Sequence, residues 1–210
     1  MKDLGESRVI LGMDIARSRG SRTLTITQER YAQKIIDRFG MTSACGQSTP
    51  MDPGVDFTVD AEPCTESYRE AIGSIMYLMV CTRPDLAYPV CNLAKFVEKP
   101  TVVHWTAVKR MLRYIIATRN LGLGFRGHDA SPVPMVYVDD DWAGDTQMSE
   151  SMCGCAVMMG PAAVTWCARQ QEVVAMSPAE AEYISICMGV KELMWIRRLV
   201  QVLGWYRGWC

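Results

Sequence analysis

Three consecutive aspartates follow a short apolar run in this 210-residue sequence. Asp139, Asp140 and Asp141 come directly after the segment PMVYV (134–138), which is rich in strand-forming residues. Carboxylates crowded at the end of a strand repel one another unless cations lie between them. The pattern therefore indicates either a solvated turn or a site for divalent cations.

A further acidic residue favours the cation site. Segment 177–204 predicts a long helix, because Ser177, Pro178 and Glu180 match a capping box with proline at the first helical position. Glu182 lies near the start of this helix and has no capping role. An aspartate on a strand and a glutamate on a facing helix are the beginning of a two-metal phosphodiester hydrolase. In such a site Mg²⁺ or Mn²⁺ ions activate water and stabilise the leaving oxygen.

The elements expected to position these acids follow from hydrophobic periodicity and turn residues. Three strands, at 134–138, 152–160 and 162–168, precede the long helix, which Gly189 is expected to bend. This order is typical of an αβ layer domain. The earlier part of the chain predicts a hairpin of 7–16 with 23–27, a helix after it that Thr27 caps and Gly40 ends, and an extended linker at 45–67.

Three more helices are expected between the linker and the aspartates, at 66–81, 84–98 and 101–122. Pro89 falls inside the second and is expected to kink it. In the third, Lys109, Arg110 and Arg113 lie largely off the apolar stripe. Together with Arg119 they form a candidate surface for nucleic-acid phosphates, although solvated helix faces would give the same pattern.

Composition limits the other possibilities. Residues 71–128 carry eight basic and two acidic side chains, whereas residues 129–192 carry two basic and ten acidic ones. No apolar run is long enough to span a membrane, and the start of the chain lacks the pattern of a signal peptide. Nine cysteines without a CxxC pair favour reduced thiols and a cytoplasmic or nuclear setting. His104 and His128 are expected at the surface or in loops.

A family resemblance extends over roughly 200 residues in order. The matching stretches are ILGMDIAR, STPMDP, YREAIGSIMYLMVCTRPDLAY, YVDDDWAGD, VTWCARQQEVVAMSPAEAEY and KELMWIRRL. They resemble the Pol polyprotein of copia-type retrotransposons, from the end of reverse transcriptase into ribonuclease H. YVDD at 137–140 is also the four-residue motif with which reverse transcriptases hold their metals. The resemblance instead aligns it with the YSDADWAGD pattern that opens ribonuclease H.

The resemblance implies a fold and a set of roles. The fold class is α+β or α/β: a β-hairpin and a helical thumb and connection region, then a truncated ribonuclease H-like αβ domain. Catalytic and metal-binding roles fall on Asp139 and Glu182, which are expected to approach each other, with Mg²⁺ or Mn²⁺ as the cofactor. Asp141 is a further candidate, because it shares the face of Asp139 if the strand persists. The implied parts are a palm-end hairpin and thumb helix (1–44), a linker (45–67), a connection region (68–128) and the ribonuclease H-like domain (133–210).

Departures from the family pattern decide among three hypotheses. No acidic residue follows Glu192, although the family has further catalytic acids beyond the long helix. The leading hypothesis is therefore a polyprotein fragment without complete catalytic centres. The alternatives are a residual ribonuclease H acting on RNA–DNA hybrids, completed by another polyprotein-derived chain, and a non-catalytic module that binds a hybrid or DNA duplex. No membrane partner is expected.

Overall fold

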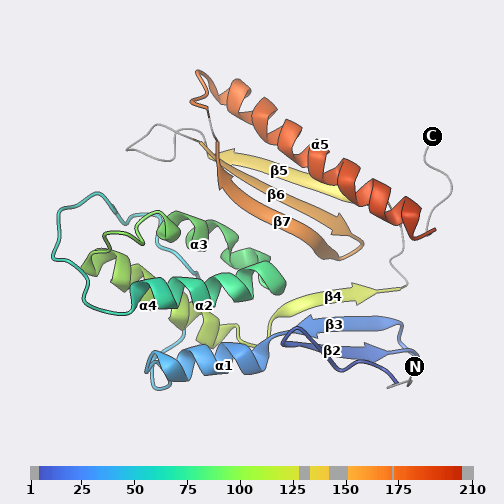
Figure 1. Ribbon diagram of the computed structural model, residues 1–210, viewed down its shortest axis with the longest axis horizontal. Coiled ribbons are helices and arrows are strands. Elements are labelled where there is room, and N and C mark those ends of the chain that lie inside the picture. Colours follow the sequence, from blue (N-terminus) through green and yellow to red (C-terminus); the bar gives the residue numbers. More distant parts are fainter. Residues whose placement is uncertain (1–4, 128–132, 142–150, 172, 205–210) are drawn as a thin grey trace. The chain divides into compact units, whose positions relative to one another are not determined.

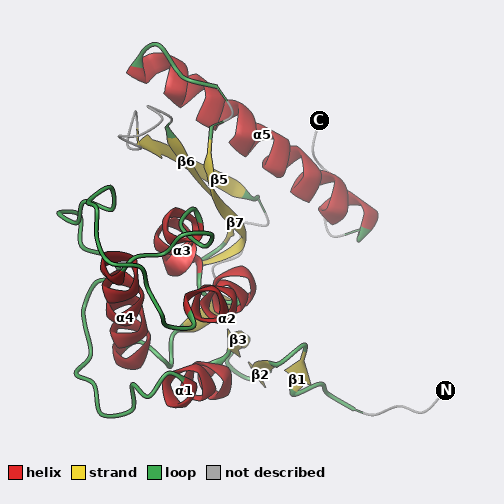
Figure 2. Cartoon of the chain, turned by 60° about the vertical axis from the view of Figure 1, so that its left-hand side comes forward, coloured by secondary structure: helices red, strands yellow, loops and turns green. Residues whose placement is uncertain are grey.

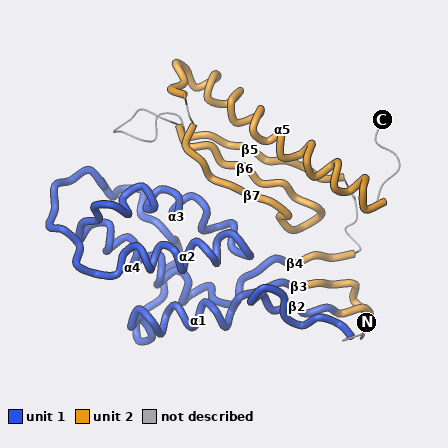
Figure 3. The backbone as a smooth tube through the Cα atoms, viewed as in Figure 1, with its two compact units in different colours: residues 1–17, 25–123 blue, residues 18–24, 124–210 orange. Residues whose placement is uncertain are grey.

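The computed structural model describes residues 5–127, 133–141, 151–171 and 173–204. Within these ranges it is a mixed α+β structure with five α-helices, one sheet of four strands and one of three (Figures 1 and 2). The chain forms two compact units, residues 1–17 with 25–123 and residues 18–24 with 124–210 (Figure 3). The four-part division by sequence stays a prediction.

The four-stranded sheet has the order β1 (Val9–Ile10), β2 (Met13–Ser18), β3 (Thr23–Thr27) and β4 (Gly122–Arg126). The expected single strand over 7–16 is two strands, because Leu11 and Gly12 both have positive φ and form a tight turn between them. Sequence analysis missed β4, since Gly122 resembles a helix terminator. A Cβ atom at Gly122 would lie 2.2 Å from the carbonyl oxygen of Ile26, so glycine allows β4 to approach β3.

Helix α1 (Glu29–Arg38) buries Ile35 and Ile36 in the core of the first unit. Its N-cap is Gln28 rather than the expected Thr27, and no side-chain hydrogen bond caps it. Gly40 ends it as expected, with a φ of 65°. The N–H of Met41 then donates to the carbonyl oxygen of Ile36 at 2.9 Å, which is the Schellman arrangement.

Three further helices complete the first unit: α2 (Tyr68–Cys81), α3 (Ala87–Ala94), which follows a 3₁₀ turn (Pro84–Leu86), and α4 (Val102–Ala117). The expected kink at Pro89 is wrong. The α-helical part begins at Ala87, so Pro89 falls in its first turn, where its missing N–H would have no helical partner in any case.

His104 is buried and not at the surface, which corrects the sequence-based expectation. It is the third residue of α4, and its Nδ1 accepts the backbone N–H of Thr101 at 2.8 Å. Its ring stacks on Phe96 with 4.1 Å between centroids. Burial lowers its pKa, while a hydrogen bond with the backbone of Phe57 raises it to a lesser extent. His104 is therefore a helix-capping core residue, and His128 lies outside the described residues.

The three-stranded sheet of the second unit has the order β5 (Met135–Asp141), β6 (Met152–Met159) and β7 (Ala162–Gln170), all antiparallel. Helix α5 (Pro178–Val202) lies along one face of this sheet (Figure 1). Val157, Ile196 and Val200 form the centre of the small core between them. The expected order of three strands and a long helix is confirmed. Within the described segments, no helix combines the length and apolar character that crossing a membrane requires.

Candidate acidic site

Strand β5, which carries the three aspartates, is regular to its end. It pairs with β6 along its whole length without a shift in register. Side chains of a regular strand alternate between the two faces of the sheet. Asp140 therefore shares a face with Val136 and Val138. Asp139 and Asp141 share the opposite face, and both are exposed.

Two contacts identify the face that α5 covers. A Cβ atom built on Gly189 of α5 would lie 2.3 Å from Cγ1 of Val138. On β6, Sγ of Cys153 lies 2.8 Å from Oγ of Ser185 in α5. Cys153 is also the direct cross-strand partner of Asp140. Since directly opposed residues share a face, Asp140 lies on the helix side of the sheet.

The electrostatic surroundings of Asp140 agree with this position. Partial burial raises the pKa of Asp140, and the negative charge of Glu182 is the next largest cause, ahead of Asp139 and Asp141. Glu182 comes from α5, one helical turn before Ser185. Every charged neighbour that shifts Asp140 is thus acidic, and ionising the whole group at neutral pH is unfavourable.

These observations correct the expected approach of Asp139 to Glu182. The strand continues through Asp141, so alternation turns Asp140, not Asp139, toward α5. The carboxylate of Asp139 instead accepts the backbone N–H of Asp140 at 3.1 Å. The expectation that Asp141 shares the face of Asp139 is confirmed. The catalytic and metal-binding roles assigned to Asp139 and Glu182 stay predictions.

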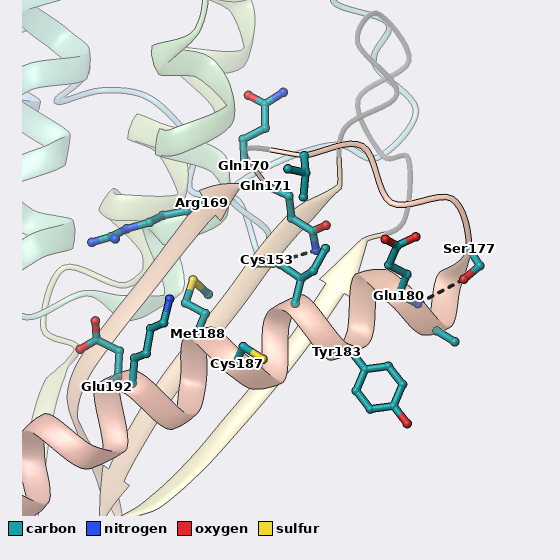
Figure 4. Close-up of a pocket in the computed structure, with 14 residues that line it drawn as sticks. Cys153, Arg169, Gln170, Gln171, Ser177, Glu180, Tyr183, Cys187, Met188 and Glu192 are labelled. Carbon is teal, nitrogen blue, oxygen red and sulfur yellow. Dashed lines mark hydrogen bonds between the residues drawn. The ribbon is translucent and has the colours of Figure 1, made fainter.

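The start of α5 is held by hydrogen bonds that fix the position of Glu182 along the sheet. Oγ of Ser177 accepts the N–H of Glu180 at 3.2 Å, as the predicted cap requires (Figure 4). The carboxylate of Glu180 accepts the N–H of Met176 at 2.8 Å. It thus reaches one residue further back than in a capping box.

Gln171, which sequence analysis did not single out, connects the same turn of α5 to the sheet. Its Nε2 donates to the carbonyl oxygen of Ala181 at 3.1 Å and to Sγ of Cys153 at 3.0 Å. Figure 4 shows this amide between the strands and the helix. The residue is buried and directly follows β7. A single glutamine after a strand carries no periodicity or motif, so nothing in the sequence indicated this role.

A groove of about 790 Å³ runs along α5 beside this glutamine. Its lining includes Lys191. It also includes Arg169 and Glu192, which Figure 4 shows on the same side of the view. Neither Asp140 nor Glu182 lines it. The groove borders the acidic site at Cys153 and Glu180, but neither carboxylate of the Asp140–Glu182 pair opens into it.

The described carboxylates do not fit a two-metal centre. Across the described ranges, no group of three or more His, Cys, Asp or Glu side chains is arranged to hold a metal ion. The helix side of the sheet offers Asp140 and Glu182, and the other side offers Asp139 and Asp141. Two hard cations need more oxygen ligands than either pair supplies.

Two of the four basic residues predicted to bind phosphates are held by residues 45–57. Nη2 of Arg110 donates to Oγ1 of Thr49 at 2.9 Å. Nε of Arg113 donates to the carbonyl oxygen of Cys45 at 2.7 Å. The sequence predicts an extended linker at 45–67 and carries no signal for these contacts, because they join positions more than 60 residues apart.

The other two basic residues differ from each other. Nε of Arg119 lies 3.8 Å from a carboxylate oxygen of Glu29 in α1. Lys109 is exposed. With Arg110 and Arg113 it lines a groove of about 540 Å³ between α4 and residues 41–57. The basic face of α4 is thus a real feature of the first unit, but most of its cations already have partners.

The chain is similar over nearly its whole length to polyproteins from plant transposons. The chain is 40% identical over 97% of its length to a retrovirus-related Pol polyprotein from a transposon of Nicotiana tabacum, TNT 1-94. It is 34% identical over 97% of its length to the corresponding polyprotein from transposon RE1 of Arabidopsis thaliana. It spans only 16% and 14% of these two polyproteins.

A shorter relative is covered over most of its length. The uncharacterized mitochondrial protein AtMg00810 of Arabidopsis thaliana is 31% identical over 93% of the chain, and the match spans 80% of that protein. No family model matches the chain, and no solved structure matches it. The long matches to the transposon polyproteins agree with the motifs quoted above. The chain belongs to the retrovirus-related Pol polyproteins of copia-type transposons.

Proposed function

We propose that the chain corresponds to the part of a Pol polyprotein that runs from the end of reverse transcriptase into ribonuclease H. Under this proposal the first unit contains the palm-end hairpin, the thumb helix and the connection helices. The sheet β5–β7 with α5 is the opening layer of a ribonuclease H-like domain. The order of the elements, the acids at the end of β5 and the glutamate near the start of α5 support this assignment.

We further propose that the chain by itself does not hydrolyse RNA in a hybrid. One observation carries this proposal: Asp140 lies on the side of the sheet that α5 covers, where the charge of Glu182 acts on it, whereas the family resemblance assigns the first catalytic role to Asp139. The two acids with implied catalytic roles then lie on different sides of the sheet. A catalytic group misplaced by about 1 Å already costs on the order of 100-fold in rate. An aspartate on the opposite face of the sheet is displaced by more than that.

Cleavage of an RNA–DNA hybrid with Mg²⁺ or Mn²⁺ tests this proposal. The chain is compared with Asp139→Asn and Glu182→Gln, and all three are expected to give the same background rate. Robust cleavage that Asp139→Asn abolishes would establish the residual hydrolase instead. Cleavage that begins only when a second polyprotein-derived chain is added would identify that chain as the source of the missing acid.

A second candidate function is sequence-independent binding of an RNA–DNA hybrid or DNA duplex by the basic face of α4. The groove lined by Lys109, Arg110 and Arg113 favours it. Binding that neutralises phosphates weakens steeply as salt rises, because counterions are released. Replacing these three residues and Arg119 by alanine is expected to weaken binding and flatten its salt dependence. Unchanged affinity and unchanged salt dependence would exclude this surface.

A further inference from the structure

Residues 45–57 form a segment without helix or strand that crosses α4. The backbone N–H of Gln47 donates to the carbonyl oxygen of Arg113 at 3.1 Å. A Cβ atom at Gly46 would lie 2.9 Å from Cβ of Ala117, so the segment approaches the helix closely at this point. The segment is therefore packed on α4 and is more than a connection between two elements.

The polar groups of this segment engage the cations of α4. Oγ1 of Thr49 and the carboxylate of Asp52 both approach Arg110, at 2.9 Å from Nη2 and 3.5 Å from Nη1. The carbonyl oxygen of Cys45 accepts from Nε of Arg113. A hydroxyl, a carbonyl and a carboxylate are oxygen acceptors, as phosphate oxygens are. They occupy guanidinium donors that a phosphate would need.

One donor of Arg110 is left over. Its Nε is buried and has no hydrogen-bond partner in the described part of the chain. A guanidinium group offers five N–H donors in a planar fork that matches phosphate geometry. The segment thus satisfies only some of the hydrogen-bond donors of Arg110. A phosphate that accepted hydrogen bonds from more of these donors would bind Arg110 more favourably than the segment does.

We propose that residues 45–57 regulate the basic face of α4 by competing with nucleic-acid phosphates for Arg110 and Arg113. Asp52 supplies the competing negative charge, and nucleic acid displaces the segment when it binds. The inference rests on the second candidate function, duplex binding by α4, and specifies how that surface is controlled. Lys109, which projects from the same groove, provides the first contact with an incoming phosphate.

The exposure of the ion pair makes displacement feasible. The side chain of Arg110 is 30% exposed and that of Asp52 is 49% exposed, so solvent screens the attraction between them. Exposed ion pairs of this kind contribute little free energy. A competitor of that strength lowers the affinity for a duplex by only a few-fold and does not block it.

The test measures binding of an RNA–DNA hybrid and a DNA duplex at low salt, with the chain and two variants. Asp52→Asn removes the competing charge, and its duplex affinity is expected to rise about two- to fivefold. Asp60→Asn is the matched control, because it changes the net charge equally from an exposed position further along the same linker. Asp60→Asn is expected to leave the affinity nearly unchanged.

The outcomes separate competition by residues 45–57 from duplex binding by α4. If the chain binds a duplex and Asp52→Asn binds no better than Asp60→Asn, competition is excluded while duplex binding stands. If neither the chain nor Asp52→Asn binds, duplex binding and the inference both fail. Hydrogen exchange at Gln47 gives an independent readout. Its amide is expected to lose protection when the duplex binds, and retained protection in the complex would overturn the displacement.

Discussion

Two aspartates, one in each unit, lie among charged neighbours and respond in opposite directions. Burial raises the pKa of Asp85, but hydrogen bonds and charge from Arg83 outweigh it and lower the pKa below its ordinary value of 3.8. Burial also raises the pKa of Asp140, and the acids around it, led by Glu182, raise it further. The two pKa values differ in direction because a cation, Arg83, lies beside Asp85, whereas the charged neighbours that act on Asp140 are acids.

The cluster in the first unit is complete. Arg83 is buried and donates through Nη2 to Asp85 at 2.6 Å and to Oγ1 of Thr118 at 2.7 Å. Tyr114 donates its hydroxyl to the same carboxylate at 2.8 Å. Every member has a partner, so this cluster serves stability. The acids around Asp140 only repel one another, which is unfavourable for stability and typical of a functional site.

The largest expected effect is the loss of the buried cation. Arg83→Met leaves Asp85 without its charge partner. It also removes two hydrogen bonds to Thr118, one to Oγ1 and one from Nη1 to the carbonyl oxygen at 3.0 Å. Breaking a fully buried pair from one side costs about 3–5 kcal/mol. The Asp85 side chain is 32% exposed, so the free energy of unfolding of the first unit should fall by the lower end of that range, about 3 kcal/mol. Urea unfolding measures it. Asp52→Asn breaks an exposed pair and serves as the control, with a loss below about 1 kcal/mol. A loss that small for Arg83→Met would show that the cluster is not structural.

A smaller effect is expected where α5 approaches β5. A Cβ at Gly189 would lie 2.3 Å from Val138 and 3.0 Å from Val136, so Gly189→Ala forces the helix and strand apart. Overpacking of this kind costs about 1–3 kcal/mol. In contrast, Gly73 in α2 has open space around its Cβ position. Gly73→Ala should stabilise its helix by about 0.5–1 kcal/mol.

Thermal unfolding of the two alanine variants tests this contrast. Opposite shifts of the melting temperature are expected, downward for Gly189→Ala and upward for Gly73→Ala. If Gly189→Ala raised the melting temperature as well, the close packing of α5 on the aspartate-bearing strand would be disproved. The same result would remove one of the two contacts that assign Asp140 to the helix side.

The smallest expected effect concerns pH. A carboxyl with a raised pKa destabilises the folded state once it ionises, so Asp140 reduces stability as pH rises from 3.8 through its raised pKa. Asp85 has a lowered pKa. Its contribution to the stability of the folded state is present above pH 3.8 and is lost as the pH falls through that lowered pKa. Asp140→Asn should therefore stabilise the second unit by about 0.5 kcal/mol at pH 7 and by nothing at low pH. A stabilisation of equal size at both pH values would contradict the repulsion.

Sequence reasoning succeeded where the signal was local. Helix α1, with apolar residues at helical spacing and Gly40 at its end, was predicted closely, and so was the cap of α5 at Ser177. It failed where the decisive contact was remote. Gly122 is a strand residue because Ile26 lies against it. Arg110 is hydrogen-bonded by Thr49 and paired with Asp52, both from another segment.

The acidic site is an intermediate case. The types of residue and their approximate location could be predicted, because acids at a strand end and at a helix start are visible in the sequence. Which aspartate faces the helix depends on how far the strand continues. Strand β5 extends to Asp141 instead of ending at 138, and the period of two then selects Asp140. If the predicted strand is extended to 141, alternation from Val136 and Val138 places Asp140 on their face.

Titration of the Asp140 carboxyl by carbon-detected NMR, in the chain and in Glu182→Gln, shows whether these two acids act on each other. A midpoint above 3.8 is expected in the chain, because Asp140 is partly buried and the negative charge of Glu182 acts on it. Neutralising Glu182 should move that midpoint down toward 3.8. Glu180→Gln, which removes a capping carboxylate that does not act on Asp140, should leave it in place. An Asp140 midpoint that is the same with and without Glu182 would show that these two side chains do not face each other.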